Sequence, residues 1–219
     1  MFKNFDFAAI ERALPLLLQG MQMTLELTVL AIAGGIVFGT LLALVRLSKF
    51  RAISFIGGTY VNFFRSVPLI LVIFWFYFLV PKIIGRPVGS FYSVLIAFVM
   101  FEAAYYCEII RAGIQSVSRG QINAGLAVGL TYAQTMRHIV LPQAFRNMIP
   151  VLLTQSIIMF QDTSLVYVVG LKDFLTTADL IANRDNRLVE MFLTVAVVYF
   201  AICLLGSLVV RKLQRKYAI

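Results

Sequence analysis

Charged side chains are scarce in this sequence of 219 residues, where they make up 13% of the chain against 61% for hydrophobic residues. A soluble domain typically carries about 25% charged residues, because charge covers the surface that water contacts. A surface that faces lipid needs no such cover. The composition therefore excludes an ordinary soluble domain and indicates a membrane protein.

Motifs of the common enzyme classes are also absent. Gly is never followed by Lys, so the chain has no phosphate-binding G-x-x-x-x-G-K-[ST] loop. Neither G-x-S-x-G nor H-E-x-x-H occurs, and the one histidine, His138, cannot supply a metal cluster. We predict that the chain is not an enzyme and holds no cofactor. The two cysteines, Cys107 and Cys203, lie in separate apolar segments, which favours packing roles over a disulfide.

Five apolar segments can cross a bilayer, for which a helix needs about 20 residues. Residues 29–45 and 191–210 hold no charge, and the other three segments reach this length only past Arg65, Glu102 or Asp162. The first apolar run continues past any plausible cleavage point, so we expect a retained span rather than a signal peptide. We predict spans at about residues 21–45, 58–80, 90–110, 147–169 and 189–210.

Basic residues concentrate in one set of connections, which carries eleven bases and no acid, whereas the other set mixes bases with acids. By the positive-inside rule the basic set is cytoplasmic, the N-terminus periplasmic and the C-terminus cytoplasmic. This distribution accounts for the net charge of +9 without nucleic acid as a partner. The basic set comprises Arg46, Lys49, Arg51, Arg111, Arg119, Arg137, Arg146, Arg211, Lys212, Arg215 and Lys216.

The long connection 111–146 shows a helical pattern. Its apolar residues recur at Ile122, Leu126, Leu130 and Ala133. The residues 131–134 read T-x-x-Q, a capping box that predicts the start of a second short helix, which Pro142 should end. Two such helices suit either docking to a partner or contact with the lipid surface, and periodicity does not choose between them.

Charges inside spans are costly, at about 2.5–3.5 kcal/mol near the bilayer centre, so they usually face protein or a watery cavity. Glu102 and Asp162 lie near the middle of their predicted spans. Arg65 precedes Pro68, which predicts a helix break lining a cavity. These charges fit a polar translocation path. The alternatives are a structural ion pair, such as Arg65–Asp162, or a protonated buried acid.

Three further features of the predicted spans are weaker evidence for function. Glu26 and Glu108 lie nearer span ends, where a side chain can reach toward the interface. Gly35 and Gly39 form a G-x-x-x-G pattern, which permits close approach between helices.

The cytoplasmic connection resembles the motif of transmembrane subunits of bacterial ABC importers, written E-A-A, three residues, G, nine residues, I-x-L-P. The spacing fits, but Asn123 replaces the glutamate and Gly125 replaces the second alanine. The matching residues are Ala124, Gly129, Ile139, Leu141 and Pro142.

Several further segments are similar to the polar amino acid branch of that family, over about residues 20–211. Residues 101–106 and 160–163 most resemble glutamate/aspartate importer permeases. The segments are Thr24-Leu25, residues 64–69 (FRSVPL), residues 108–114 (EIIRAGI), Gly120-Gln121, residues 141–144 (LPQA) and residues 162–165 (DTSL).

The resemblance implies an all-α, polytopic permease of the type I ABC importer fold, with about five transmembrane helices and a coupling loop at about 114–142 between spans three and four. Residues 1–19 would be a periplasmic segment, 20–211 the transmembrane domain and 212–219 a basic cytoplasmic tail. Asn123, Ala124, Gly129, Ile139, Leu141 and Pro142 would couple to the ATPase. Arg65, Glu102, Asp162, Thr163 and Ser164 would line the substrate path.

The implied partners are a periplasmic amino-acid-binding protein, a second permease subunit, identical or homologous, and two ABC ATPase subunits that use ATP. The chain would act in the bacterial inner membrane. An ion-coupled secondary amino acid transporter is the alternative, although such transporters more often show two repeated halves. An ion channel would need a filter or a charged ring, and neither is evident.

Overall fold

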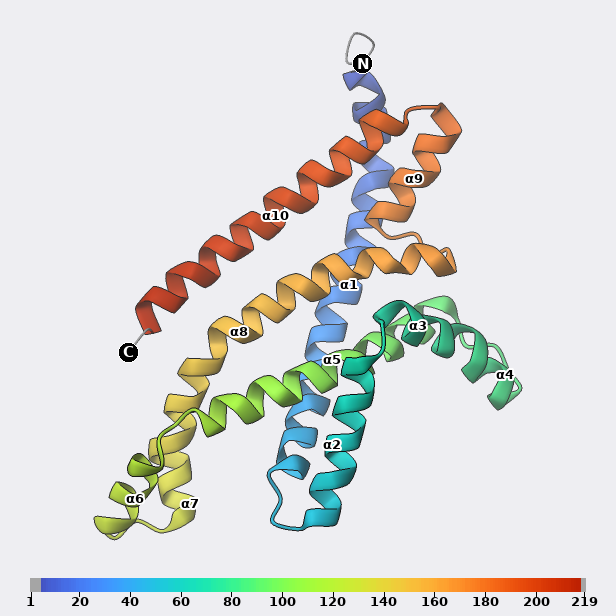
Figure 1. Cartoon of the computed structure of the whole chain (residues 1–219). Helices are drawn as coiled ribbons and strands as arrows, with labels where there is room; N and C mark the ends of the chain where they lie inside the picture. The colour runs from blue at the N-terminus through green and yellow to red at the C-terminus, as the bar shows by residue number, and fades with distance from the viewer. Residues whose placement is uncertain (1–4, 218–219) are drawn as a thin grey trace.

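The computed structural model describes residues 5–217, with side chains through residue 215, so Lys3 and the side chain of Lys216 lie outside the described residues. The described residues contain helices and no strands, which confirms the all-α prediction (Figure 1). The helices are α1 (Phe7–Arg46), α2 (Arg51–Ser66), α3 (Leu69–Phe74), α4 (Val80–Ile84), α5 (Ser90–Gln115), α6 (Arg119–Ala127), α7 (Tyr132–Thr135), α8 (Leu141–Asp162), α9 (Phe174–Asp185) and α10 (Leu188–Tyr217). Two π-helical turns, η1 (Trp75–Leu79) and η2 (Met136–Val140), and the 3-10 helix η3 (Thr163–Val169) extend them.

Four described helices are long and apolar enough to cross a membrane, and a bent pair, Arg51–Ser66 with Leu69–Ile84, is a fifth candidate when it is counted as one broken span. These four to five candidates agree with the prediction of about five spans. The helix that contains the predicted first span begins at Phe7, before the expected residue 21. The described part of the segment 1–19 is therefore largely helical and continuous with α1.

The second span is broken where the sequence predicted a break. Val67 is extended, with φ −113° and ψ 137°, and the helices on its two sides meet at 105°. Pro68 is the cause, because its ring disfavours a helical conformation at the preceding residue. Arg65 thus lies in the last turn of α2, beside the bend.

Helix α1 packs closely along α5, and glycines at the contact permit this. A Cβ atom on Gly39 would lie 2.7 Å from Cβ of Tyr106 and 3.0 Å from the carbonyl oxygen of Ala103. A Cβ atom on Gly35 would lie 2.8 Å from Cβ of Glu102. The G-x-x-x-G prediction of close helix approach is confirmed, with α5 as the neighbour.

The segment 171–188, which connects the fourth and fifth predicted spans, contains α9, which packs beside α1 and α10 (Figure 1). Asp173 caps it by accepting hydrogen bonds from the amides of Leu175 and Thr176, at 3.2 and 2.8 Å. Burial raises the pKa of Asp173, and these hydrogen bonds oppose the rise. The apolar face of α9 is short, with Ala178 and Ala182 at its centre, so periodicity alone did not reveal it.

The connection between α5 and α8 forms two short helices, as predicted. Thr131 and Gln134 make the capping box that begins α7. Gly129 turns the chain before it with φ +87°, a conformation that favours glycine. The predicted end at Pro142 is wrong, because the chain stays helical through it into α8. The π-helical turn η2 lies just before Pro142, and its wider spacing accommodates a residue without an N–H group.

Candidate translocation and coupling sites

Glu102 is fully buried in α5 and faces α8. Its two carboxylate oxygens accept hydrogen bonds from Nε2 of Gln155, at 3.0 and 3.2 Å. One turn along α5, the hydroxyl of Tyr106 lies 3.3 Å from Oγ of Ser156. The polar groups of one α5 face thus meet those of α8 in the interior. Gln155 and Ser156 were not predicted from the sequence, although the spacing of Glu102 and Tyr106 places those two residues on one helical face.

Asp162 ends α8, where it is half-buried. Asp162 lies within electrostatic reach of Glu102. Thr163 is buried and donates to the carbonyl oxygen of Phe160 at 2.7 Å, and Ser164 is half-buried in the following turn. Within residues 5–215 no ion pair joins Asp162 to Arg65, so the alternative of a structural pair between them is not formed.

Arg65 is exposed at the end of α2, and its guanidinium carbon lies 5.4 Å from the ring centroid of Tyr105. It lines a cavity of about 450 Å³ with residues of α5 and α8, among them Glu108 and Asn147, and with Ser116, which follows α5. Of the residues near the helix break, Arg65 lines this cavity, whereas Val67 and Pro68 do not. Glu102 and Asp162 do not line it, so the structure separates Arg65 from the two acids with which it was grouped.

Glu108, which the sequence placed near a span end, is held by two basic residues of the predicted cytoplasmic set. It forms ion pairs with Arg46 at the end of α1 and with Arg111, whose Nη2 lies 2.7 Å from Oε2. The side chains of Arg46 and Glu108 are only 18% and 17% exposed. Sequence position alone placed Glu108 near a span end, but the contact between α1 and α5 brings Arg46 onto it.

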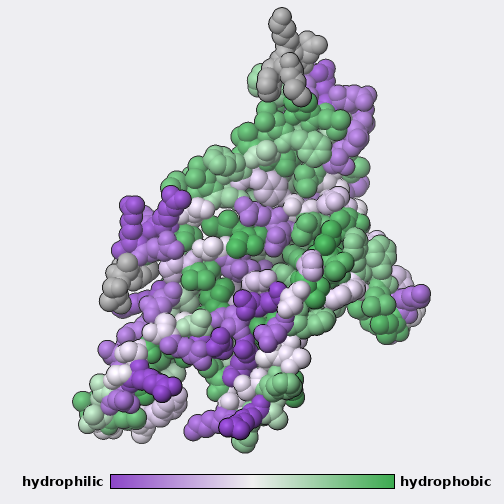
Figure 2. Space-filling view, in the orientation of Figure 1, coloured by the Kyte–Doolittle hydropathy of each residue, from purple (hydrophilic) through white to green (hydrophobic). Residues whose placement is uncertain are grey.

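The six residues expected to couple to the ATPase lie on α6, in the turn at Gly129, on η2 and at the start of α8. Asn123, Ala124, Gly129, Leu141 and Pro142 are exposed, and Ile139 is half-buried. Exposed apolar residues, among them Val128 and Tyr132, lie in the same connection. Figure 2 shows hydrophilic and hydrophobic residues intermixed at the lower left, where Figure 1 labels α6 and α7. A mixed surface of this kind fits protein docking.

Gly125, which departs from the motif, has a steric explanation. It is buried, and a Cβ atom there would lie 2.7 Å from Cγ2 of Thr135 and 3.0 Å from Cδ1 of Ile139. The side chains of α7 and η2 therefore occupy the space that the usual alanine would need.

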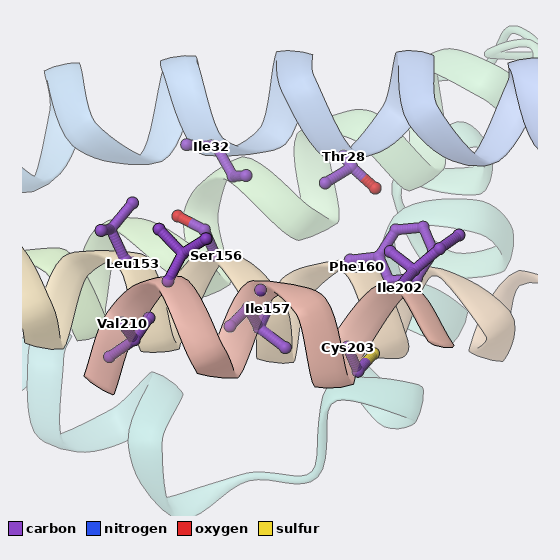
Figure 3. A pocket seen from close by; sticks show the side chains of 11 residues that line it. Thr28, Ile32, Leu153, Ser156, Ile157, Phe160, Ile202, Cys203 and Val210 are labelled. Atoms are coloured by element: carbon purple, nitrogen blue, oxygen red, sulfur yellow. The ribbon is translucent and has the colours of Figure 1, made fainter. Parts of the chain in front are cut away.

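A second cavity, of about 350 Å³, lies between α1, α8 and α10 and is lined by no charged residue. In Figure 3, Thr28 and Ile32 of α1 lie across from Leu153, Ser156 and Ile157 of α8. A charged ligand would find no partner here, so this cavity is not a path for a free amino acid. Cys203 lines it as a free thiol, and Cys107 is also free, as predicted.

No group of three or more metal-ligating side chains capable of holding an ion occurs among the described residues.

Several named permease proteins are similar to this chain over nearly its whole length. The glutamate/aspartate import permease protein GltK of Escherichia coli O6:H1 is 52% identical, over 98% of this chain and 99% of its own length. The glutamine transport system permease protein GlnP of Escherichia coli K12 is 33% identical, over 99% of each chain. The arginine transport system permease protein ArtQ of Bacillus subtilis is 31% identical, over 97% of each chain.

Solved structures agree with this pattern. An amino acid ABC transporter crystallised with histidines matches with a TM-score of 0.91 and 32% identity, covering 96% of this chain and 98% of that one. An inward-facing MetNI methionine ABC transporter, at 21% identity and a TM-score of 0.74, shares the fold. Residues 35–219 match the family described as binding-protein-dependent transport system inner membrane component. The chain therefore belongs to this family, as an ABC importer permease subunit of the kind that includes the amino acid permeases.

Proposed function

We propose that this chain is the permease subunit of an ATP-driven importer that moves an acidic amino acid, glutamate or aspartate, across the bacterial inner membrane. The observation that carries the proposal is Glu102, a carboxyl buried inside a span and bonded to Gln155. The 52% identity to GltK, a glutamate/aspartate permease by name, supports the substrate class.

The membrane orientation follows the positive-inside rule, with the N-terminus periplasmic and the α6–α7 connection cytoplasmic. The ATPase activity belongs to separate subunits that dock at that connection, and a periplasmic binding protein delivers the substrate. A second permease subunit, identical or homologous, completes the pathway. A cysteine in place of Asp179 on α9 should react with a membrane-impermeant thiol reagent in intact cells, whereas one in place of Arg119 should not.

Glu102 and Asp162 are suited to the α-ammonium of the substrate. A positive charge is costly at membrane depth, and a nearby carboxylate lowers that cost. Arg65 is suited to a carboxylate, which its planar guanidinium can bind through two hydrogen bonds. Thr163 and Ser164 continue the path beyond Asp162.

The test is uptake of radiolabelled glutamate into proteoliposomes that hold the complete complex, with ATP inside and the binding protein outside. Glu102→Gln should slow uptake while the complex still assembles, because the amide keeps the size but not the charge. Normal uptake by this variant would remove Glu102 from the path. Uptake that needs an ion gradient rather than ATP would favour the secondary transporter instead.

Coupling is tested at Gly129, whose φ of +87° disfavours any side chain. Gly129→Asp should leave the permease in the membrane but loosen its ATPase, so that substrate-stimulated ATP hydrolysis falls. Asn123→Ala should have a smaller effect, because the usual glutamate is already absent. Full coupling in the Gly129 variant would show that the ATPase docks elsewhere.

A further inference from the structure

The cavity beside Arg65 differs from the surroundings of Glu102 in position and in charge. It lies between the end of α2, the last turns of α5 and the first half of α8. Glu102 lies further back along α5, toward its N-terminal end. Ser116 and Asn147 add neutral polar groups to the cavity, and Nδ2 of Asn147 donates to Oγ of Ser116 at 2.9 Å.

The charges around this cavity do not balance. Glu108 is its only acidic lining residue, and both of its oxygens are engaged by Arg46 and Arg111. Arg65 has no acidic partner within residues 5–215, and it lies within electrostatic reach of Arg46. Arg46 and Arg111 thus share Glu108, and Arg65 adds a further positive charge on the cavity lining. A bound carboxylate would offset this excess positive charge.

We propose that this cavity is a separate binding station for the carboxylate groups of an acidic amino acid, with Arg65 as the residue that holds one of them. The proposal rests on the proposed function for the substrate class. At about 450 Å³ the cavity falls in the range of small-molecule sites, roughly 300–1,000 Å³. It lies on the α6–α7 side of Glu102, so in the proposed orientation the substrate meets Glu102 first and Arg65 before release.

Glutarate is a suitable probe, because it has two carboxylates and no ammonium, and a site built around the acid Glu102 does not favour it. Its binding is measured by isothermal titration calorimetry on the purified complex with its ATPase, without nucleotide and without the binding protein. Arg65→Gln should weaken glutarate binding by about tenfold or more, the size expected when a charged hydrogen bond is lost. The matched control is Arg51→Gln, the same substitution at an exposed base in the first turn of α2, which should bind like wild type.

A second variant tests whether glutarate occupies the cavity without changing the charge of any residue. Ala112 lines the cavity, and Ala112→Leu should weaken glutarate binding by filling it while leaving every arginine in place. The proposed binding station would be overturned if either Arg65→Gln or Ala112→Leu bound glutarate as tightly as wild type. It would also be overturned if Arg51→Gln lost as much glutarate affinity as Arg65→Gln. Absence of glutarate binding to the wild-type complex would overturn it as well. Failure of the proposed function appears separately, as absence of ATP-driven glutamate uptake by the wild-type complex.

Discussion

Ion pairs fasten helix α1 at both of its ends, but the two clusters differ in charge balance and exposure. At the N-terminal end Asp6 pairs with Arg12 and Arg187, and Arg187 also pairs with Glu190 at the start of α10. Acids and bases are equal in number there, and the Arg12 side chain is 71% exposed.

The C-terminal end of α1 has the opposite character. Arg46 and Arg111 share Glu108, Arg65 lies nearby, and the Arg46–Glu108 pair is largely shielded from water. A shielded charge depends on its partner far more than an exposed one, because water cannot replace the lost contact. The C-terminal cluster therefore holds α1 against α5 and leaves excess positive charge beside the cavity, whereas the N-terminal cluster contributes little to stability.

The largest expected effect is at Glu108. Glu108→Gln leaves Arg46 and Arg111 without their acid, and we expect it to lower the free energy of unfolding by about 2–4 kcal/mol. The measurement is the fraction of folded protein after heating in detergent, followed by size-exclusion chromatography. Glu26→Gln, at an exposed acid of α1, is the control and should change little. Equal stability of the two variants would contradict the importance of the C-terminal cluster.

A steric change tests the contact that supports this cluster. In Gly39→Ala the new methyl group meets the backbone of α5, so we expect a loss of about 1–3 kcal/mol despite the better helix propensity of alanine. Gly58→Ala in α2, where the nearest atom is the far end of Arg46 at 3.9 Å, should be neutral or stabilising. The same heating assay compares the two, and a neutral Gly39 variant would mean that α1 and α5 are not held this closely.

A smaller effect is expected on the other side of the molecule. Asp173→Ala removes the cap of α9 and should cost about 1 kcal/mol, whereas Asp173→Asn should retain most of the stability. Hydrogen exchange of the α9 amides measures this locally. No change in exchange for the alanine variant would show that packing against α1 and α10 suffices to hold α9.

The smallest effect is expected at Arg12. Arg12→Gln removes an exposed ion pair and should leave thermal stability unchanged within error, at low and at high salt. A loss comparable to that of Glu108→Gln would abolish the distinction between the two ends of α1.

Features that depend on composition and on neighbouring residues could be predicted from the sequence. The all-α character, the approximate number of membrane spans and the bend before Pro68 follow from apolar length and proline chemistry, and the structure agrees with all three. The capping box at Thr131 and the turn at Gly129 are likewise local, because both depend on residues within a few positions.

Which polar groups contact each other depends on how the helices cross, and this could be seen in the tertiary structure alone. Helical spacing places Glu102 and Tyr106 on one face, but the crossing of α5 with α8 selects Gln155 and Ser156 as their neighbours. The close approach of α1 likewise brings Arg46 to Glu108, and the bend after α2 places Arg65 over Tyr105, apart from Asp162. Partners distant in the chain depend on how helices cross, and the periodicity of one helix contains no information about the position of another.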